Sequence, residues 1–308
     1  MKSEIAIIGA GRIAYSLCSA LVKSNYKIKT VVSRNINSAK ALAEKFGIKN
    51  YSDDVQSIDK SAKVFFLSVP DSEIRSVANK LSKCKLGFRN SLFIHLSGAE
   101  NISLLNALRK KGAATASLHI MQTFPSKKIM SLKEVHAAIE TDDPSAYKYL
   151  TSLSSILGMI PYKIDSASKV YYHLAGVFAS NFLAGNLYSS HQLLKLINVN
   201  NEKVSFDILN STIHTTLKNI RNNGAAFALS GPVDRGDIKT IKRHLTALKK
   251  LSDKKPESNY FNLLLNNYIE QSLNLLNLVK EKHGSLNKKH IEIEKLLVQE
   301  LRETVKSK

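Results

Sequence analysis

Cysteine is scarce in this sequence, and long apolar runs are absent. Two cysteines in 308 residues, Cys18 and Cys84, are too few for a disulfide framework and suit a reducing compartment. No stretch approaches the roughly 20 consecutive apolar residues that a membrane-spanning helix needs. The first residues lead straight into the strand-like segment 4–8 without a signal-peptide pattern. We therefore expect a cytoplasmic protein that does not span a membrane.

Acidic residues are scarce relative to basic ones. Lys and Arg number 45 against 25 Asp and Glu, which gives a formal net charge of +20. Such an excess invites a nucleic-acid partner, but residues 1–165 carry 24 basic and 13 acidic side chains, so about half of the excess lies in each half of the chain. Arginine, whose planar fork suits phosphate and guanine, supplies only nine of the cations. We therefore do not expect a nucleic-acid partner.

The length suits two domains of ordinary size, and the first half of the chain alternates strand and helix patterns. The expected strands are residues 5–8, 28–32, 64–69, 92–95 and 114–118. The expected helices are residues 12–24, 38–46, 73–81 and 104–110. Short strands that are apolar throughout are typical of a parallel sheet covered on both faces. Since such strands are joined by right-handed crossovers, the pattern predicts a doubly wound α/β sheet over residues 1–165.

The second half changes to a helical period, and no segment after residue 168 reads as a strand. The expected helices are residues 168–197, 203–222, 237–251, 258–282 and 286–306. The helix at 258–282 is apolar on more than one face, so it lies centrally in its own domain or packs on another subunit. We predict an all-α domain over residues 166–308 that carries substrate contacts and forms a homodimer.

A glycine-rich turn connects the first strand to the first helix. It follows the pattern G-x-G-x-x-A and consists of Gly9, Ala10, Gly11, Arg12, Ile13 and Ala14. Gly9 allows the tight turn, Gly11 lets a diphosphate approach the backbone, and Ala14 keeps the helix close to the strand. The strand before it and the helix after it supply the context that this motif requires. The turn predicts a Rossmann dinucleotide site; the alternative is a helix-entry turn with incidental glycines.

The end of the second strand bears on the choice of cofactor. An acidic residue there would bond the ribose 2′-hydroxyl of NAD, but the chain has Ser33 and Arg34, with no Asp or Glu beside them. A serine can donate to a 2′-phosphate, and an arginine can pair with it. Arg12 is a second candidate cation. This predicts NADP in preference to NAD; the alternative is that Arg34 simply points into solvent.

Val69 and Pro70 close the strand at 64–69. Ligands of open α/β sheets bind at the carboxyl ends of the strands, and a proline there removes an N–H group and stiffens the chain. We therefore expect both residues beside the nicotinamide. The alternative is a plain strand terminator.

Further segments form a recognisable set in a fixed order. They are residues 95–99 (HLSGA), 117–124 (SLHIMQTF), 172–181 and 229–237 (LSGPVDRGD). Together they resemble the NADP oxidoreductases that join a Rossmann-like domain to the helical domain-of-unknown-function family 2520, and the resemblance covers nearly the whole chain. This family is similar to pyrroline-5-carboxylate reductase, ketopantoate reductase and the β-hydroxyacid dehydrogenases. The chain departs from it at residues 119–122, which read His-Ile-Met-Gln where the family usually has His-Pro-Leu-Gln.

The resemblance implies hydride transfer between NADPH and a small 2-oxo acid or cyclic imine, with ketopantoate as a candidate. By similarity to the β-hydroxyacid dehydrogenases, Lys169 is the proton donor and His173 takes the place of their asparagine, four residues on and on the same helix face. Asn181, two turns further, can bind a substrate carboxylate or the nicotinamide amide. The alternatives are a solvated lysine and a histidine that packs a helix.

Two histidines end consecutive strands of the predicted sheet. The residues expected at one crevice there are His95, Ser97, Gly98, His119 and Gln122. His119 is the second candidate proton donor, because an unperturbed imidazole titrates near neutral pH. Ser97 and Gly98 can offer a hydroxyl and an N–H group to a substrate carboxylate. The remaining histidines show no metal-ligand spacing, so we expect no metal site.

The alternative to an enzyme is a regulatory protein that binds NADP without chemistry. Such a protein would keep the phosphate-binding turn but tolerate any polar residues in the cleft, and the ordered set of lysine and histidines argues against it. In the segment 229–237, Asp237 is expected to cap the following helix. Arg235 has two interpretations, a contact in the cleft or a contact with a partner subunit.

Overall fold

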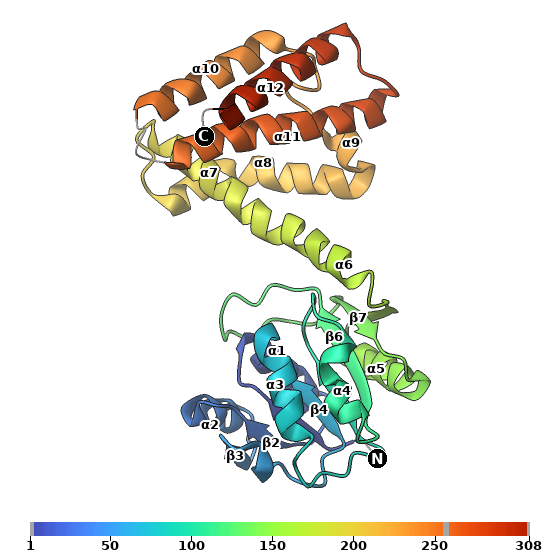
Figure 1. Ribbon diagram of the computed structural model, residues 1–308. Coiled ribbons are helices and arrows are strands. Elements are labelled where there is room, and N and C mark those ends of the chain that lie inside the picture. The colour runs from blue at the N-terminus through green and yellow to red at the C-terminus, as the bar shows by residue number, and fades with distance from the viewer. Residues whose placement is uncertain (1–2, 255–258, 307–308) are drawn as a thin grey trace. The chain divides into compact units, whose positions relative to one another are not determined.

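The computed structural model describes residues 3–254 and 259–306. Contacts within the chain divide it into two units, Met1–Leu183 and Ala184–Lys308, and each is described by itself (Figure 1). The first unit includes the beginning of the long helix that the sequence assigns to the helical domain. The predicted boundary at residue 165 stays a prediction.

The first unit is built on one eight-stranded sheet with the order β3-β2-β1-β4-β5-β6-β7-β8. The strands are β1 (Ile5–Ile8), β2 (Ile28–Val32), β3 (Asn50–Ser52), β4 (Val64–Leu67), β5 (Leu92–His95), β6 (Ala114–Ile120), β7 (His136–Glu140) and β8 (Ile160–Lys163). All neighbours pair parallel except β6 and β7, which run antiparallel with Ser117 opposite Glu140. The predicted fold class, a doubly wound Rossmann-type sheet followed by a helical region, is confirmed, with this one antiparallel pair added.

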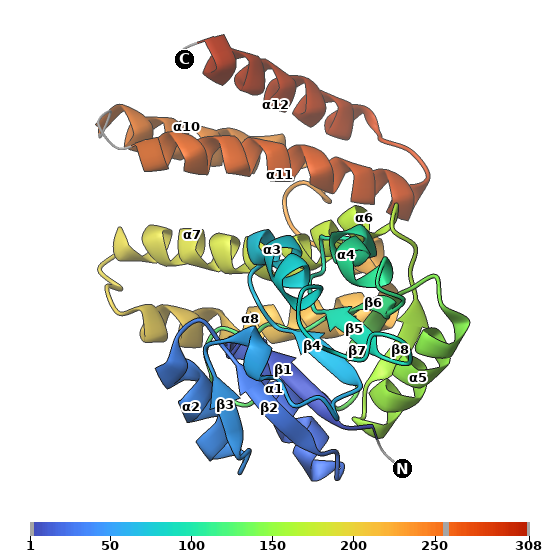
Figure 2. The same ribbon diagram turned by 60° about the horizontal axis from the view of Figure 1, so that its bottom comes forward.

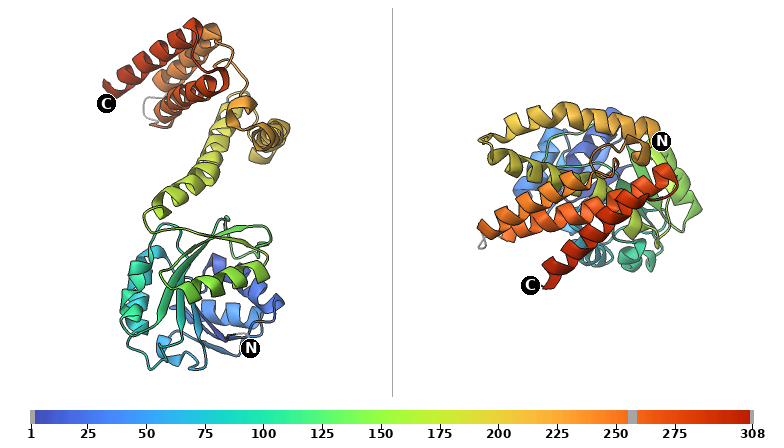
Figure 3. Two further views of the ribbon diagram at one scale, coloured as in Figure 1. Left: turned by 90° about the vertical axis from the view of Figure 1, so that its right-hand side faces the viewer. Right: turned by 90° about the horizontal axis from the view of Figure 1, so that it is seen from above.

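Helices cover both faces of the sheet (Figure 3). They and the shorter 3-10 turns are α1 (Arg12–Lys23), α2 (Ile36–Lys45), η1 (Val55–Ser57), α3 (Asp71–Leu81), η2 (Ile102–Leu105), α4 (Asn106–Arg109) and α5 (Pro144–Ile156). Side chains of α1, α2 and α5 pack in one apolar cluster, and those of α3, η2 and α4 pack in a second cluster. The sequence of α1 shows why such a helix packs on the sheet. Its apolar residues Ala14, Leu17, Cys18 and Leu21 recur every three or four positions on one face, and all are fully buried.

Three strands, β3, β7 and β8, have no counterpart among the strands that the sequence predicts. β3 and β8 are the edge strands of the sheet. β3 is three residues long and largely exposed, and β8 carries Pro161 and leaves Ile160 exposed. Short edge strands with a proline lack the continuous apolar pattern of a central strand. β7, which contributes Glu140, lies inside the sheet, but its sequence His-Ala-Ala-Ile-Glu has a single large apolar residue.

The second unit is helical, as predicted. Its helices after residue 201 are α8 (Glu202–Asn223), α9 (Ala225–Ala228), α10 (Ile238–Lys254), α11 (Asn259–His283) and α12 (Lys288–Lys306). α10, α11 and α12 lie together (Figure 2) and share an apolar core in which Ile241, Ile269 and Ile293 are fully buried. The Asp237 carboxylate accepts a hydrogen bond from the Thr240 N–H at 3.1 Å, so the expected cap of α10 is present.

One uninterrupted helical segment leads along the chain from the first unit into the second. It comprises α6 (Lys169–Gly176), a π-helical segment η3 (Val177–Phe182) and α7 (Leu183–Lys195). The helix expected at residues 168–197 is present, and the π-helical part is a feature that the sequence pattern did not indicate. π-Helical turns are rare and often occur at functional sites. Across the described ranges, no helix is both long enough and apolar enough to cross a membrane.

Candidate functional site

The turn between β1 and α1 has the geometry that the G-x-G-x-x-A pattern requires. Gly9 has a φ of +103°, and a methyl group on its Cα would lie 2.1 Å from the carbonyl oxygen of Ser68. Its N–H donates to the Val32 carbonyl at 2.7 Å, which ties the turn to β2. Only glycine fits this position. Gly11 is the N-cap of α1, so the free N–H groups of the first helical turn face the space above the turn, where an anion binds well.

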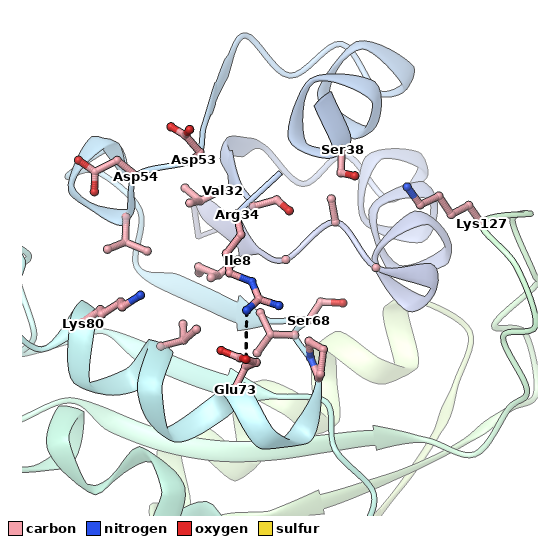
Figure 4. A pocket seen from close by; sticks show the side chains of 18 residues that line it. Ile8, Val32, Arg34, Ser38, Asp53, Asp54, Ser68, Glu73, Lys80 and Lys127 are labelled. Atoms are coloured by element: carbon pink, nitrogen blue, oxygen red, sulfur yellow. Dashed lines mark hydrogen bonds and ion pairs between the residues drawn. The ribbon is translucent and has the colours of Figure 1, made fainter. Parts of the chain in front are cut away.

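A cavity of about 410 Å³ opens at this turn (Figure 4). Its lining includes the predicted cofactor residues Gly9, Ala10, Gly11, Ser33, Arg34, Val69 and Pro70. Arg12 and Ile13, the first residues of α1, are not part of this lining, and Arg12 is exposed. The strand order reverses between β1 and β4, and in open α/β sheets such a reversal is where nucleotides bind.

Arg34 points into this cavity and pairs with Glu73 of α3, with 3.1 Å between Nη1 and Oε1 (Figure 4). Asp53 and Asp54 also line the cavity. No acid stands beside Ser33 and Arg34 in the sequence, but the fold corrects that interpretation, because Asp53 and Asp54 after β3 and Glu73 of α3 bring three carboxylates to the cavity. The Arg34 side chain is 73% exposed, and ion pairs of that kind contribute about 0–1 kcal/mol. A bound phosphate can therefore replace Glu73 as the partner of Arg34.

Gly98, which follows β5, is the point where two imidazoles meet. A methyl group on its Cα would lie 2.6 Å from Nε2 of His119 and 2.8 Å from Nδ1 of His173. The centroids of the two rings are 6.1 Å apart. Gly98 is buried, whereas both histidines are partly exposed. The fold thus brings together three predicted site residues, one each from the ends of β5 and β6 and one from α6.

His119 is held by Tyr172 of α6. Its Nδ1 lies 3.2 Å from the Tyr172 hydroxyl oxygen, and the rings meet edge to face. Burial, with smaller contributions from His173 and Lys169, lowers the pKa of His119 to about 4, so the imidazole is neutral at pH 7. Burial also raises the pKa of Tyr172, so this group stays a phenol. One nitrogen of a neutral imidazole is therefore engaged, and the other faces the space beside Gly98.

Lys169 is buried, with 1% of its side chain exposed. Its ammonium lies 3.1 Å from Oε2 of Glu140, 3.2 Å from the Ser97 carbonyl and 2.5 Å from the Ser117 hydroxyl. Desolvation lowers the pKa of Lys169, and the charge of Glu140 opposes that shift. Three partners match the three hydrogens of an ammonium group. The predicted role of Lys169 as proton donor stays a prediction.

Glu140, at the end of β7, is the counter-ion of Lys169 and is 3% exposed. Its Oε1 accepts hydrogen bonds from the Ile102 N–H at 3.1 Å and from the Ser166 hydroxyl at 2.5 Å. One carboxylate therefore joins β7, η2 and the chain that enters α6. The sequence analysis missed this residue because it missed β7.

Ser97 and His95 are packed into the interior. The Ser97 hydroxyl donates to Oδ2 of Asp71 at 2.7 Å and accepts from the Glu100 N–H at 3.0 Å. His95 is fully buried, and desolvation, followed by the charge of Lys169, lowers its pKa to about 3. For the Ser97 hydroxyl to donate to a substrate carboxylate, it must release Asp71. The expected substrate contact of Ser97 stays a prediction.

Another cavity, of about 440 Å³, is bordered by the end of β6, the chain after it, α6 and η3. Its lining residues are His119, Met121, Gln122, Thr123, Phe124, Pro125, His173, Gly176, Val177, Ala179, Ser180 and Asn181. The predicted substrate residues Gln122 and Asn181 thus border the same cavity as both imidazoles. A mostly apolar wall with a few polar groups is typical of small-molecule sites.

Other polar residues noted in the sequence lie in the second unit and line neither of these two cavities. Asp234 in the segment 229–237 pairs with Lys282 at 3.0 Å, while Arg235 is exposed. His191 is buried and lies 2.7 Å from the Ser205 hydroxyl. Within residues 3–254 and 259–306, no group of three or more His, Cys, Asp or Glu side chains is placed to hold a metal ion.

Two further residues, Tyr172 beside His119 and Lys127 in the cavity lining, were not given a role from the sequence. Tyr172 stands beside His173 in one of the recognised segments, but its contact with His119 spans 53 positions of the chain. Lys127 follows Pro125 in the irregular chain after β6, and it lines the cavity at the phosphate turn. Its position after the carboxyl end of a strand was the available signal.

Comparisons with known proteins match this organisation. A family model described as NADP oxidoreductase, coenzyme F420-dependent, matches residues 4–94, and the model of a domain of unknown function, DUF2520, matches residues 135–267. No curated protein matches the chain. The two matches confirm the resemblance given by the sequence segments, and with it the predicted enzyme class, an NAD(P)-dependent oxidoreductase.

Solved structures with the same fold include reductases. A Bacteroides fragilis protein assigned as an NADP oxidoreductase is 26% identical, with 86% of this chain and 97% of that chain covered and a TM-score of 0.71. Pyrroline-5-carboxylate reductase from Coxiella burnetii is 15% identical over 89% of this chain and 99% of that chain, with a TM-score of 0.55. A reductive aminase from Aspergillus terreus in complex with NADPH and ethyl-5-oxohexanoate is 12% identical over 98% of this chain and 95% of that chain, with a TM-score of 0.58. The last two show likeness of fold alone.

Proposed function

We propose that this protein is an NADP-dependent reductase that transfers a hydride between NADPH and a small 2-oxo acid or cyclic imine, with ketopantoate as one candidate. The observation that carries the proposal is the meeting of His119 and His173 at Gly98, beside a cavity of suitable size and in the same unit as a dinucleotide turn. A reduction needs a hydrogen-bond donor and a proton source at the atom that gains negative charge. Two imidazoles at one point meet that need.

The cavity at the phosphate turn fits a dinucleotide. Gly11, the N-cap of α1, carries no side chain, which leaves the N-terminus of α1 open to a diphosphate. Ser33 and Arg34 would hold the adenosine end, and Val69 and Pro70 would border the nicotinamide end. A nicotinamide bound there supplies or accepts the hydride. The choice of NADP over NAD is part of this proposal.

His119 acts in the proposal as a neutral hydrogen-bond donor. The proposal requires the tautomer in which Nδ1 accepts from the Tyr172 hydroxyl and the hydrogen is on Nε2, the nitrogen that faces Gly98. As the substrate carbon gains a hydride, the bond electrons move to its oxygen or nitrogen, and the Nε2–H group stabilises that charge. With a pKa of about 4, His119 is almost never protonated at neutral pH and is a poor source of the proton itself.

His173 then donates the proton to the substrate atom. It is partly exposed and borders the same cavity, so it can be reprotonated from solvent. In the reverse direction it accepts this proton. The three contacts of the Lys169 ammonium support a positioning role, because a group that is fully engaged in the interior is poorly placed to deliver a proton.

Titration calorimetry tests the cofactor, and a screen of NADPH oxidation tests the reaction. We expect NADPH to bind more tightly than NADH; NADH binding tenfold more tightly would defeat the choice of NADP. The screen covers 2-oxo acids and cyclic imines. The variants His173→Asn and His119→Asn are then assayed with the active substrate. Each change should lower kcat by about 100-fold or more, as loss of general acid catalysis does, and leave NADPH affinity within threefold. His214→Asn, on the exposed face of α8, is the matched control.

The result of the screen also separates an enzyme from a regulatory protein. Tight NADPH binding without oxidation by any substrate class, and without effect of the histidine changes, would favour the non-catalytic alternative. Activity that survives in both histidine variants and disappears in Lys169→Met, with stability intact, would return the proton to Lys169.

A homodimer through the second unit and a cytoplasmic location are further parts of the proposal. Several large apolar side chains of α7 to α9 and their connections are exposed by 41–67%, and a second copy would cover them. They include Leu193, Ile197, Phe206, Ile208, Leu217 and Phe227. Cys18 and Cys84 are both free and buried, which suits a reducing compartment. Light scattering of the purified chain tests the dimer; a monomeric mass at micromolar concentration would exclude it.

A further inference from the structure

The chain between β6 and β7 is fixed across α1. The Met130 N–H donates to the Ser16 hydroxyl at 2.9 Å, and Phe124 packs against the apolar cluster of that face. Between these two attachments, Lys127 carries its ammonium 5.6 Å from the centre of the Tyr15 ring. A lysine held at both flanks and over an aromatic face has a restricted range of positions.

Lys127 is a cation of the phosphate-turn cavity with no ion-pair partner among the described residues, whereas Arg34 in the same cavity is paired with Glu73. Figure 4 shows Lys127 on the same side of the cavity as Ser38 and directed into it. Lys127 therefore offers an ammonium to a ligand without first breaking a salt bridge.

The charges of this cavity are separated. Asp53 and Asp54 lie on one side, near β3, as does Lys80 of α3, and Glu73 of α3 is paired with Arg34, while Ser38 and Lys127 lie on the opposite side (Figure 4). A phosphate group carries nearly two negative charges at neutral pH. The carboxylates repel such a group, and the lysine with its neighbouring hydroxyl attracts it. An added phosphate is therefore favoured beside Lys127 and Ser38, because Lys80 lies on the side of the carboxylates and Arg34 is paired with Glu73.

We propose that Lys127 binds the 2′-phosphate of NADP, together with Ser33 and Ser38. This inference rests on the proposed function and identifies a residue, in addition to Arg34, that separates NADP from NAD. The 2′-phosphate is the one group that NADP has and NAD lacks, and it belongs to the adenosine end, which Ser33 borders. The diphosphate has its own site at the N-terminus of α1.

Calorimetry with four ligands on the full chain tests the assignment. Lys127→Met should weaken the affinity for NADPH and 2′,5′-ADP about tenfold or more. It should change the affinity for NADH and 5′-ADP less than twofold. Lys127→Arg should keep most of the preference for NADPH. Lys128→Met, a neighbouring lysine outside the cavity lining, should change none of the four affinities. Urea unfolding of each variant checks that the Tyr15 contact is not required for folding.

Equal weakening of NADPH and NADH by Lys127→Met would assign the lysine to the diphosphate and overturn the proposal. Unchanged NADPH affinity would overturn it as well, while leaving the proposed function in place. Failure of the proposed function looks different, because the unaltered chain would then bind neither NADPH nor NADH, or would bind NADPH and oxidise it with no substrate class.

Discussion

Lys169 and Glu140 form an ion pair with 3.1 Å between Nζ and Oε2, and their side chains are 1% and 3% exposed. A buried pair is of uncertain net benefit to folding, but removal of one partner leaves an uncompensated charge in the interior and costs about 3–5 kcal/mol. The contact also connects the start of α6 to β7, and α6 carries Tyr172 and His173.

We predict that Lys169→Met lowers the free energy of unfolding by about 3–5 kcal/mol, measured by urea denaturation. Lys169→Met combined with Glu140→Leu should cost less than the sum of the single changes, because no buried charge remains alone. Lys148→Met, an exposed lysine of α5, serves as the control and should have little effect. A stable Lys169→Met protein with no turnover would contradict the positioning role.

The lowered pKa of His119 makes the stability of the protein sensitive to acid. Its pKa is about 4 in the folded chain and near 6.5 in the unfolded chain, so between these values the unfolded state binds more protons. Stability therefore falls as the pH drops from 6.5 to 4, by roughly 2 kcal/mol at pH 5 relative to pH 7 for this group. His95, with a pKa of about 3, adds a loss of the same sign.

Denaturation at pH 7 and pH 5 checks this effect. The unaltered protein should lose more stability between the two values than His119→Gln does, since glutamine does not titrate. Identical losses in the two proteins would show that His119 is not buried as a neutral group.

Gly98→Ala should separate catalysis from cofactor binding. The new methyl group would lie within 2.8 Å of both imidazoles and force at least one of them out of place. We expect kcat to fall by at least tenfold, since small displacements of catalytic groups are costly, with NADPH affinity within threefold. Gly87→Ala, whose methyl group would meet only the end of the Lys63 side chain, is the control. Retained turnover in Gly98→Ala would remove the two histidines from the reaction.

Two glycines of the phosphate turn should respond differently to the same change. Gly9→Ala places a methyl group 2.1 Å from the Ser68 carbonyl at a φ of +103°, so it should lower the free energy of unfolding by more than about 1 kcal/mol and abolish NADPH binding. Gly11→Ala meets the same oxygen at 3.5 Å, an ordinary contact. It should fold normally and lose NADPH affinity, because its methyl group occupies the approach of the diphosphate. Urea denaturation and calorimetry measure both, and normal NADPH affinity in Gly11→Ala would contradict a diphosphate at this turn.

Glu73→Gln should raise the preference for NADPH over NADH about threefold. The change frees Arg34 from its ion pair and removes a carboxylate from the cavity. The pair is exposed and contributes about 0–1 kcal/mol, whereas a hydrogen bond between charged groups contributes about 1.5–3 kcal/mol. Calorimetry at two salt concentrations checks the effect, which should shrink at the higher one. An unchanged ratio would show that Arg34 takes no part in phosphate recognition.

The sequence predicts well the parts of this structure that depend on local pattern. Buried parallel strands, the period of α1 and the turn at Gly9 all follow from residues close to one another in the chain. The pairing of Arg34 with Glu73 does not, because 39 positions separate them and only the sheet order brings them together. Lys169 was predicted by similarity to the β-hydroxyacid dehydrogenases, but its burial depends on Glu140, in a strand that the pattern did not reveal.

The chain after β6 borders both cavities: residues 121–125 line the one that holds the two imidazoles, and Lys127 lines the one at the phosphate turn. Pro125 and Lys127 are two positions apart. A ligand that moves Lys127 toward the cavity at the phosphate turn therefore also shifts the residues that line the cavity of the two histidines. When two ligands contact the same segment, the effect of each on the affinity of the other is equal, because their coupling is reciprocal. Cofactor and substrate would then change each other's affinity by the same factor, and titration of each in the presence of the other would reveal it.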